Sequence, residues 1–432
     1  MLFVETSARI KLMLIVENFA PDIDVSALRM GELVNAISRH QEADCRVVVH
    51  RLEQASKTKR VVTKIANNAS AVRYEFKYLP QVLSKIAVSN PLSLLLTTLI
   101  AMREVRDYKP DLILTTVPTY TPSIAAYLVS FLLGKRHCID VRDDWISQRV
   151  GKWAISELPR YKRFFTTLTF RISNALFIRA CKRAFLLSSV YEEHRKDLQK
   201  LTNYDKPVVR IPNGINLSEL NTVEQTFNKP AFLRKYGIPV DEGYKYVIYA
   251  GTIAGYHRPE VFIAPLRRLL SEGKKVYYII AGGGDPHALN KEIETARVKK
   301  NVFLLGKITH TDTLKLLLAG DVAFYAFSKA YPDLSALSVK ILEYVACRLP
   351  ILAIIDERVS AARFIKTHGI GIVLGWEDLP DLPSSFDRLL QDPRYAANID
   401  AYYPDFISEF ERGTNSERWY QALVENYQSA AR

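Results

Sequence analysis

The second half of this 432-residue chain contains a glycine turn suited to binding a phosphorylated ligand. Gly251 and Thr252 follow the apolar run Tyr246–Ala250, and Arg258 comes shortly afterwards. Glycine at a strand-to-helix turn lets backbone amides approach an anion, and a guanidinium can hold a diphosphate through two hydrogen bonds. The segment lacks the GxGxxG fingerprint, so binding of NAD is not supported. A structural turn followed by a surface arginine is the alternative interpretation.

Three consecutive glycines mark a second candidate binding loop. Gly282, Gly283 and Gly284 follow the apolar run Val276–Ala281. They either permit close approach of the backbone to a ligand or simply form a flexible turn. A second glycine-rich strand end in the same half of the chain favours the ligand-binding interpretation.

A carboxylate and an ammonium group stand one helical turn apart in the segment Ser338–Pro350. Lys340 and Glu343 are predicted to lie in the first half of a helix whose N-terminus faces a phosphate. A carboxylate there can accept hydrogen bonds from two ribose hydroxyls. The alternative is an i,i+3 ion pair on a solvated helix face. The apolar residues around Glu343 indicate that it is not fully exposed.

Charged residues also follow apolar runs in the first half of the chain. Asp22 and Asp24 precede a helical segment that carries Arg29, and Arg142 and Asp143 follow a later run. Charges next to a buried strand end cost free energy unless they are paired or face a cleft. These residues therefore belong either to an acceptor site or to a salt-bridged structural cluster.

Short apolar runs alternate with helical patterns through the whole chain. Fully apolar strands separated by helices indicate parallel sheets covered on both faces. The predicted strands are Lys11–Val16, Cys45–Val49, Val72–Leu79, Leu112–Thr116, His137–Val141, Ala184–Leu187, Val208–Ile211, Tyr246–Ala250, Val276–Ala281, Val302–Leu305, Val322–Ala326 and Pro350–Ile355.

This pattern predicts an α/β protein with two Rossmann-like, doubly wound domains. A polar segment at about residues 216–243 contains Pro230, Pro239 and Gly243 but no buried strand, so it marks the domain boundary. The first domain is predicted over residues 1–215 and the second over 216–404. Ligands of such sheets bind at the carboxyl ends of the strands, where the strand order reverses. The two sets of strand-end loops are therefore expected to face each other across a cleft.

Composition argues against metal chemistry and against a spanning helix. The four cysteines are far apart and the eight histidines form no HExxH pair, so no metal site and no metal or organic cofactor is predicted. No secretory signal is recognised at the start, and the apolar stretch Pro91–Met102 is shorter than the ~20 residues that span a bilayer. We therefore predict a cytoplasmic protein, with the option of peripheral attachment to the inner face of the cell membrane.

The positive charge is concentrated in the first half of the chain. The net charge is +13, and residues 1–200 contain 31 Lys and Arg against 19 Asp and Glu, whereas the remainder is nearly balanced. A one-sided basic surface suits anionic headgroups, phosphorylated substrates or nucleic acid. No nucleic-acid-binding module is visible, so a nucleic acid is not the predicted partner. A solvated basic face that maintains solubility is the alternative.

Six segments, in order, resemble the motifs of a large family of retaining glycosyltransferases with the GT-B fold. This family 4-like group includes bacterial polysaccharide and sucrose-phosphate-forming enzymes, and the resemblance extends over nearly the whole chain. The segments are Asn18–Arg29, Val141–Trp145, Ile211–Ile215, Gly282–Gly284, Asn301–Gly306 and Lys340–Pro350.

The resemblance implies a role for each candidate residue. Glu343 would hold the donor ribose, and Arg258 would hold the diphosphate. Residues 405–432 would form a helix that returns toward the first domain. The other implied donor-site residues are Gly251, Thr252, Gly282, Gly283, Gly284, Lys307, Ile308, Ser338 and Lys340. Arg258, Lys340 and Asp143 form the predicted catalytic group, and Asp22, Asp24, Arg29, Arg142 and Asp143 the acceptor side.

The chain also departs from the family pattern. Ser335 stands where many members carry a first glutamate, which affects the predicted contacts with the sugar. The predicted function is transfer of a sugar from a nucleotide-diphosphate donor, with retention, to a glycan or polyprenyl-linked acceptor. The alternatives are a nucleotide-sugar 2-epimerase of the same fold and a catalytically silent subunit that acts as a scaffold.

Overall fold

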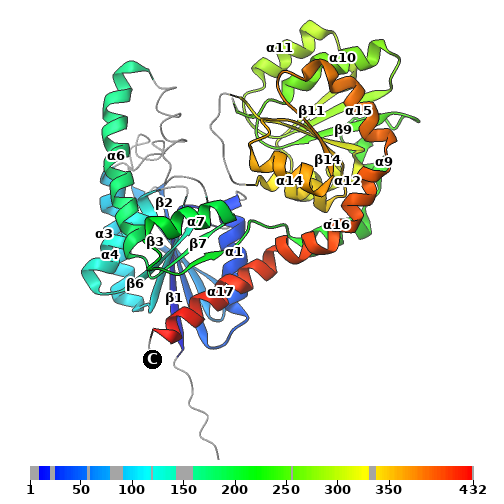
Figure 1. Cartoon of the computed structure of the whole chain (residues 1–432). Coiled ribbons are helices and arrows are strands. Elements are labelled where there is room, and N and C mark those ends of the chain that lie inside the picture. The colour runs from blue at the N-terminus through cyan, green and yellow to red at the C-terminus, as the bar shows by residue number, and fades with distance from the viewer. Residues whose placement is uncertain are drawn as a thin grey trace, which may run out of the picture. The chain divides into compact units, whose positions relative to one another are not determined.

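The chain folds into two compact units in a computed structural model (Figure 1). The structure describes residues 9–19, 25–55, 59–77, 91–117, 120–142, 159–253, 256–329 and 337–430. Unit 1 comprises Met1–Asn213 and Arg412–Arg432, and unit 2 comprises Gly214–Glu411. The boundary drawn from the sequence after residue 404 falls inside helix α16 (Arg394–Phe410), which belongs to unit 2. The predicted cleft between the units stays a prediction.

The sheet of unit 1 has eight strands in the order β3-β4-β2-β1-β5-β6-β7-β8. All neighbouring strands pair in parallel except β3 and β4, which are antiparallel. The strands are β1 (Ile10–Val16), β2 (Ala43–Ala55), β3 (Lys59–Ala66), β4 (Ala69–Lys77), β5 (Leu112–Val117), β6 (Arg136–Val141), β7 (Leu186–Ser189) and β8 (Val208–Arg210). β3 was not predicted, because this edge strand is largely exposed and carries lysines and an arginine in place of an apolar run.

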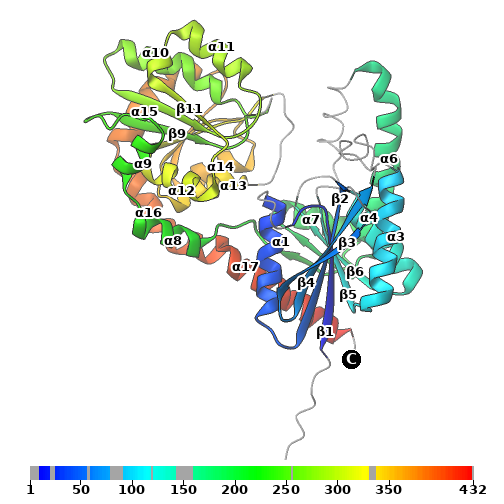
Figure 2. The same ribbon diagram turned by 180° about the vertical axis from the view of Figure 1, so that it is seen from behind.

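Helices cover both faces of this sheet (Figure 2). Leu12 and Leu14 of β1 pack with residues of α1 and α17, whereas Met13 and Ile15 pack with residues of α3 and α4. This alternation follows from the two-residue period of a strand. The helices of the unit are α1 (Val25–Ser38), α3 (Pro91–Tyr108), α4 (Tyr120–Leu133), α6 (Arg160–Arg183), α7 (Glu192–Leu201) and α17 (Arg412–Ser429).

The C-terminal helix α17 is part of the core of unit 1. Trp419 and Leu423 are buried beside α1, and Glu417 Oε1 lies 2.6 Å from His40 Nε2. The chain therefore leaves unit 1 after β8 and returns to it at Arg412.

Unit 2 contains a six-stranded sheet, all parallel, in the order β11-β10-β9-β12-β13-β14. Its strands are β9 (Lys245–Ala250), β10 (Val276–Ala281), β11 (Val302–Gly306), β12 (Val322–Ala326), β13 (Ile351–Ile354) and β14 (Gly371–Leu374). Its α-helices are α8 (Leu217–Thr226), α9 (Lys229–Lys235), α10 (Ile263–Ser271), α11 (His287–Ala296), α12 (His310–Ala319), α13 (Val339–Ala346), α14 (Ser360–His368), α15 (Leu382–Gln391) and α16, with 3-10 turns at Pro259–Phe262, Lys299–Asn301 and Leu379–Asp381. β14 was not predicted, because this four-residue strand begins at a glycine.

Both sheets reverse their strand order at the centre. The reversal lies between β1 and β5 in unit 1 and between β9 and β12 in unit 2. The predicted fold class, two doubly wound α/β domains, is therefore confirmed. Loops that follow these central strands are the positions where such folds bind ligands.

The apolar stretch Pro91–Met102 forms the first part of α3. None of the helices in the described part of the chain combines the length and hydropathy required to cross a bilayer.

Candidate functional site

The strand-end loops of β9, β10 and β11 pack directly against one another in unit 2. Gly251 N donates to Ala281 O, and Gly282 N donates to Gly306 O, both at 2.8 Å. A Cβ atom on Gly282 would lie 1.8 Å from the carbonyl oxygen of Gly251, so this position excludes every other residue. Gly284 meets the Ile253 carbonyl in the same way. Glycine is thus required at positions 282 and 284 because the main chain after β10 lies in close contact with the main chain after β9.

Lys340 of α13 lies across the end of β9. A Cβ atom on Gly251 would be only 1.8 Å from Lys340 Cε, so the glycine makes room for the lysine side chain. Lys340 Nζ is 2.9 Å from His257 Nε2 and 3.4 Å from the Tyr249 hydroxyl. The structure therefore brings Gly251 and Lys340 together at the point where the strand order reverses, as the sequence indicated. His257 and Tyr249 were not among the predicted site residues.

The environment of Lys340 and His257 shifts both side chains toward their neutral forms. Burial lowers the pKa of Lys340 to about 7, although Glu343 opposes the shift. Burial and the nearby Lys340 lower the pKa of His257 to about 3. The imidazole is therefore neutral and accepts from the ammonium group, and its buried Nδ1 has no hydrogen-bond partner in the described part of the chain. An anion next to Lys340 would stabilise the charged lysine, so this strand end favours anionic ligands.

Glu343 makes its main contact with a histidine from another helix. Its Oε1 lies 3.0 Å from Nε2 of His310, the first residue of α12. His310 Nδ1 lies 3.0 Å from Glu219 Oε2, and Thr311 donates to Glu219 Oε1 at 3.0 Å. The hydrogen bond to Glu343 raises the pKa of His310, although burial opposes it. Glu343 is thus held in place by His310, and the alternative of a solvated i,i+3 pair with Lys340 is not what the structure contains.

The remaining predicted donor residues lie at the same strand ends. Arg258 forms an ion pair with Glu260, and its guanidinium carbon is 5.7 Å from the centre of the Trp376 ring. The carbonyl of Thr252 accepts from the Tyr249 hydroxyl at 2.7 Å. Exposed Lys307 and half-buried Ile308 follow β11, and Ser338 is the N-cap residue of α13. The guanidinium of Arg258 thus already has a carboxylate partner.

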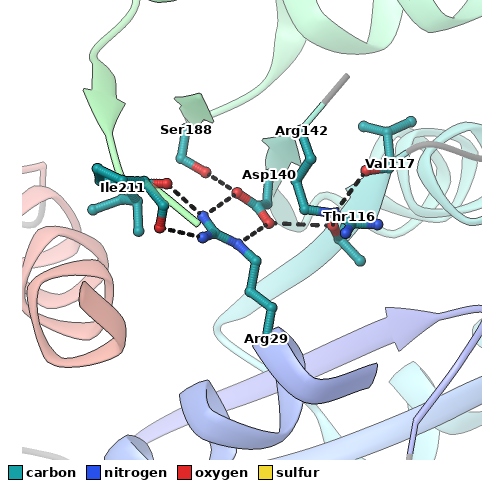
Figure 3. A network of polar contacts seen from close by, with 8 residues as sticks. Arg29, Thr116, Val117, Asp140, Arg142, Ser188 and Ile211 are labelled. Carbon is teal, nitrogen blue, oxygen red and sulfur yellow. Dashed lines mark hydrogen bonds and ion pairs between the residues drawn. The ribbon is translucent and has the colours of Figure 1, made fainter. Parts of the chain in front are cut away.

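A different cluster occupies the strand ends of unit 1 (Figure 3). Arg29 forms two hydrogen bonds to Asp140, from Nε at 2.9 Å and from Nη2 at 3.0 Å. The same guanidinium donates to the carbonyls of Pro212 at 2.8 Å and Ile211 at 2.9 Å. Arg29 therefore ties α1 to β6 and to the segment that leads into unit 2.

Asp140 is fully buried and accepts from four side-chain donors. Besides the two bonds from Arg29, Ser188 donates at 2.6 Å and Thr116 at 3.2 Å. Burial by itself would raise the pKa of Asp140, but the Arg29 guanidinium and these bonds hold it below its ordinary value. Arg142 donates from Nε to Thr116 Oγ1 at 2.9 Å and joins the same network. For Arg29 this geometry favours the salt-bridged alternative over contact with an acceptor.

The hydroxyl groups that complete this network were missed in the sequence. Thr116 and Ser188 each lie in a pair of hydroxyl residues near the end of an apolar strand, β5 and β7. Such residues in an otherwise apolar run signal a buried polar partner. The predicted residues Asp22, Asp24, Asp143 and Ser335 lie outside the described residues. Among the residues that the structure describes, no group of three or more His, Cys, Asp and Glu side chains is arranged to hold a metal ion.

Comparison with known proteins agrees with this architecture. Residues 234–405, which lie within unit 2, match the family model for glycosyl transferases group 1. No curated protein sequence matches the chain.

Solved structures with the same fold cover almost all of the chain. Sucrose-phosphate synthase from Thermosynechococcus elongatus has 14% identity and a TM-score of 0.71, over 98% of this chain and 100% of that one. A UDP-forming α,α-trehalose-phosphate synthase from Burkholderia xenovorans, in complex with glucose-6-phosphate, has 10% identity and a TM-score of 0.67, over 97% and 100%. HepE from Anabaena, in complex with UDP, has 13% identity and a TM-score of 0.63, over 96% and 100%. The predicted GT-B fold and the predicted enzyme class, a glycosyltransferase, are confirmed.

Proposed function

Since unit 2 is a group 1 glycosyltransferase domain in a GT-B protein, we propose that the chain transfers a sugar from a nucleotide-diphosphate donor to an acceptor hydroxyl. The observation that carries this proposal is the position of Lys340, which lies on Gly251 at the end of β9. Its hydrogen-bond partners among the described residues, His257 and the Tyr249 hydroxyl, are both uncharged. A diphosphate is the ligand that this environment lacks. The structurally similar Anabaena protein was solved in complex with UDP. UDP, the nucleotide that a UDP-sugar donor would release, is therefore the first ligand to test.

Two residues of α13, Glu343 and Lys340, bind different parts of the donor in this proposal. Glu343 accepts hydrogen bonds from the ribose hydroxyls, and His310 keeps its carboxylate in position. Lys340, one turn away, faces the diphosphate together with the N-terminus of the helix and Arg258. Binding of the diphosphate would require Arg258 to exchange Glu260 for the ligand, because this carboxylate occupies its guanidinium.

Catalysis rests on positioning and on stabilisation of the leaving group. The bond between the anomeric carbon and the diphosphate oxygen breaks, and the diphosphate leaves with the electron pair. The acceptor oxygen forms the new bond on the same face of the sugar and passes its proton to the departing diphosphate oxygen. Lys340 and Arg258 balance the charge on the diphosphate, so this scheme requires no metal ion. Asp143, two residues after the end of β6 in the sequence, stays a candidate third catalytic residue.

The acceptor in this proposal is a glycan or a sugar on a polyprenyl carrier, presented at the inner face of the cell membrane. The excess of basic residues in the first half of the chain supports an anionic lipid surface as the place of transfer. Arg142, Asp22 and Asp24 are the acceptor-side residues of this proposal, whereas Arg29 is held by Asp140.

Calorimetric titration with UDP tests the donor site. Glu343→Ala should weaken UDP binding by about 1–3 kcal/mol, the usual scale for loss of a charged hydrogen-bond partner. Glu294→Ala, on the exposed surface of α11, removes the same charge and should bind UDP as the unchanged protein does. Equal affinity of the Glu343 variant would place the ribose elsewhere. UDP binding without sugar transfer to any acceptor would favour a silent subunit.

A further inference from the structure

Helix α6 is a cationic helix with apolar side chains on its exposed surface. Its 24 residues include seven lysines and arginines and no aspartate or glutamate. Leu168 and Ile172 are 49% and 54% exposed, and they lie one helical turn apart on the same face. Phe164, one turn earlier, continues this stripe and is 71% exposed. In both views α6 extends beyond α3 and α4 (Figures 1 and 2).

The cations of α6 lie beside this stripe. Arg171, Arg179 and Lys182 are exposed, and within the described residues none of them forms an ion pair. Arg183 lies at the C-terminal end, with its guanidinium carbon 5.6 Å from the ring centre of Phe131. Phe131, at the end of α4, is itself 63% exposed. The same surface thus offers apolar side chains and positive charge next to each other.

A second basic segment of unit 1, at residues 57–64 around β3, has cations that are partly engaged within the protein. Arg60 of β3 forms an ion pair with Glu104 at 2.6 Å, and this carboxylate is buried under the strand. Lys64 donates to Asn67 at 3.0 Å. Lys57 and Lys85 lie outside the described residues. Of these two basic segments, α6 has the larger number of exposed cations without an ion pair among the described residues.

We propose that α6, with the exposed end of α4, is the surface that docks unit 1 on a bilayer containing anionic phospholipids. An amphipathic helix with lysines and arginines beside leucine, isoleucine and phenylalanine binds the interface through shallow insertion and charge attraction. Exposed leucine and isoleucine suit the apolar interior of a bilayer better than a nucleic acid backbone, so the composition favours lipid. This surface deepens the proposed transfer to a membrane-bound acceptor and rests on that proposal.

Vesicle sedimentation tests this surface with the full-length protein. Phosphatidylcholine vesicles with and without phosphatidylglycerol are compared over a salt series. The unchanged protein should sediment with the anionic vesicles and dissociate as salt increases. The triple variant Arg171→Gln, Arg179→Gln, Lys182→Gln should bind roughly 100-fold more weakly at low salt. The variant Leu168→Ser, Ile172→Ser should lose the binding that remains at high salt.

Matched variants in unit 2 control for charge and hydropathy. Lys291→Gln, Lys299→Gln, Lys300→Gln removes three exposed cations, and Val240→Ser, Leu304→Ser removes two exposed apolar side chains. Both controls should bind vesicles normally. Equal binding to neutral and anionic vesicles, or equal loss in both triple variants, would overturn the proposal. Binding of UDP by each variant, measured by calorimetry, separates failure of this surface from failure of the proposed transferase function.

Discussion

Both sheets have charged side chains near the ends of their strands but use them in different ways. In unit 1, Arg29 and Asp140 neutralise each other, and hydroxyl and carbonyl groups complete their hydrogen bonds. In unit 2, the ammonium group of Lys340 faces a neutral imidazole at a glycine that excludes any side chain. The first cluster is complete within the protein, whereas the second is the one that we propose a diphosphate completes.

The shifts in pKa express this difference. The pKa of buried Asp140 stays below its ordinary value because its counter-charge is adjacent. The pKa of Lys340 falls to about 7 because its burial is only weakly opposed by Glu343. Burial of a charge is therefore a sign of structure where a partner is present and a sign of function where a partner is missing.

The largest effect is expected from breaking the complete cluster. Asp140→Ala would leave the Arg29 guanidinium buried without its counter-charge, which typically costs about 3–5 kcal/mol. The free energy of unfolding in urea should fall by this amount. Glu42→Ala, which removes only the exposed pair with His40, should change it by less than about 1 kcal/mol. Equal stability of the Asp140 variant and the unchanged protein would show that the cluster is not structural.

A smaller effect should follow from filling the space beneath Lys340. Gly251→Ala would put a Cβ atom 1.8 Å from Lys340 Cε at a backbone φ of +146°, so the lysine must move. We expect UDP binding to weaken by about tenfold or more, the scale of one lost charge-assisted hydrogen bond, while the protein stays folded. Gly31→Ala is the control, because a Cβ atom there meets nothing within 4 Å. Unchanged affinity of the Gly251 variant would remove Lys340 from the donor site.

The smallest effect is a dependence of UDP affinity on pH. A diphosphate favours charged Lys340, so its pKa should rise from about 7 when UDP binds. UDP binding is then coupled to uptake of a proton by Lys340. Below pH 7 Lys340 is already protonated, so its titration should not change the UDP affinity. Above pH 7 the affinity should decrease by up to about tenfold per pH unit, until the pKa of the complex is reached.

Calorimetry in two buffers of different ionisation enthalpy measures this proton uptake directly. Lys340→Met controls for titration of UDP itself and should show no uptake from the lysine. The same proton uptake in both proteins would assign the effect to UDP. It would contradict the lowered pKa of Lys340.

Each strand predicted from the sequence overlaps a strand of the structure, because a buried parallel strand requires a continuous apolar run and little else. β3 and β14 were missed for the converse reason: one is a polar edge strand and the other is short and begins with glycine. Part of the candidate donor site could also be predicted, because its residues form patterns within short segments of the sequence. Glycines at strand ends and a lysine and glutamate one turn apart are local patterns.

The pairing of these charges was decided by the tertiary structure alone. From the sequence, the nearest partner of Glu343 was Lys340, but the structure assigns His310, 33 residues away. Arg29 was a candidate for the acceptor site until the fold placed it on Asp140, 111 residues away. Hydrophobic periodicity indicates which side chains are buried, because the pattern can be read within a single helix or strand. It does not report which charges meet, because that depends on strand order and on how distant helices pack.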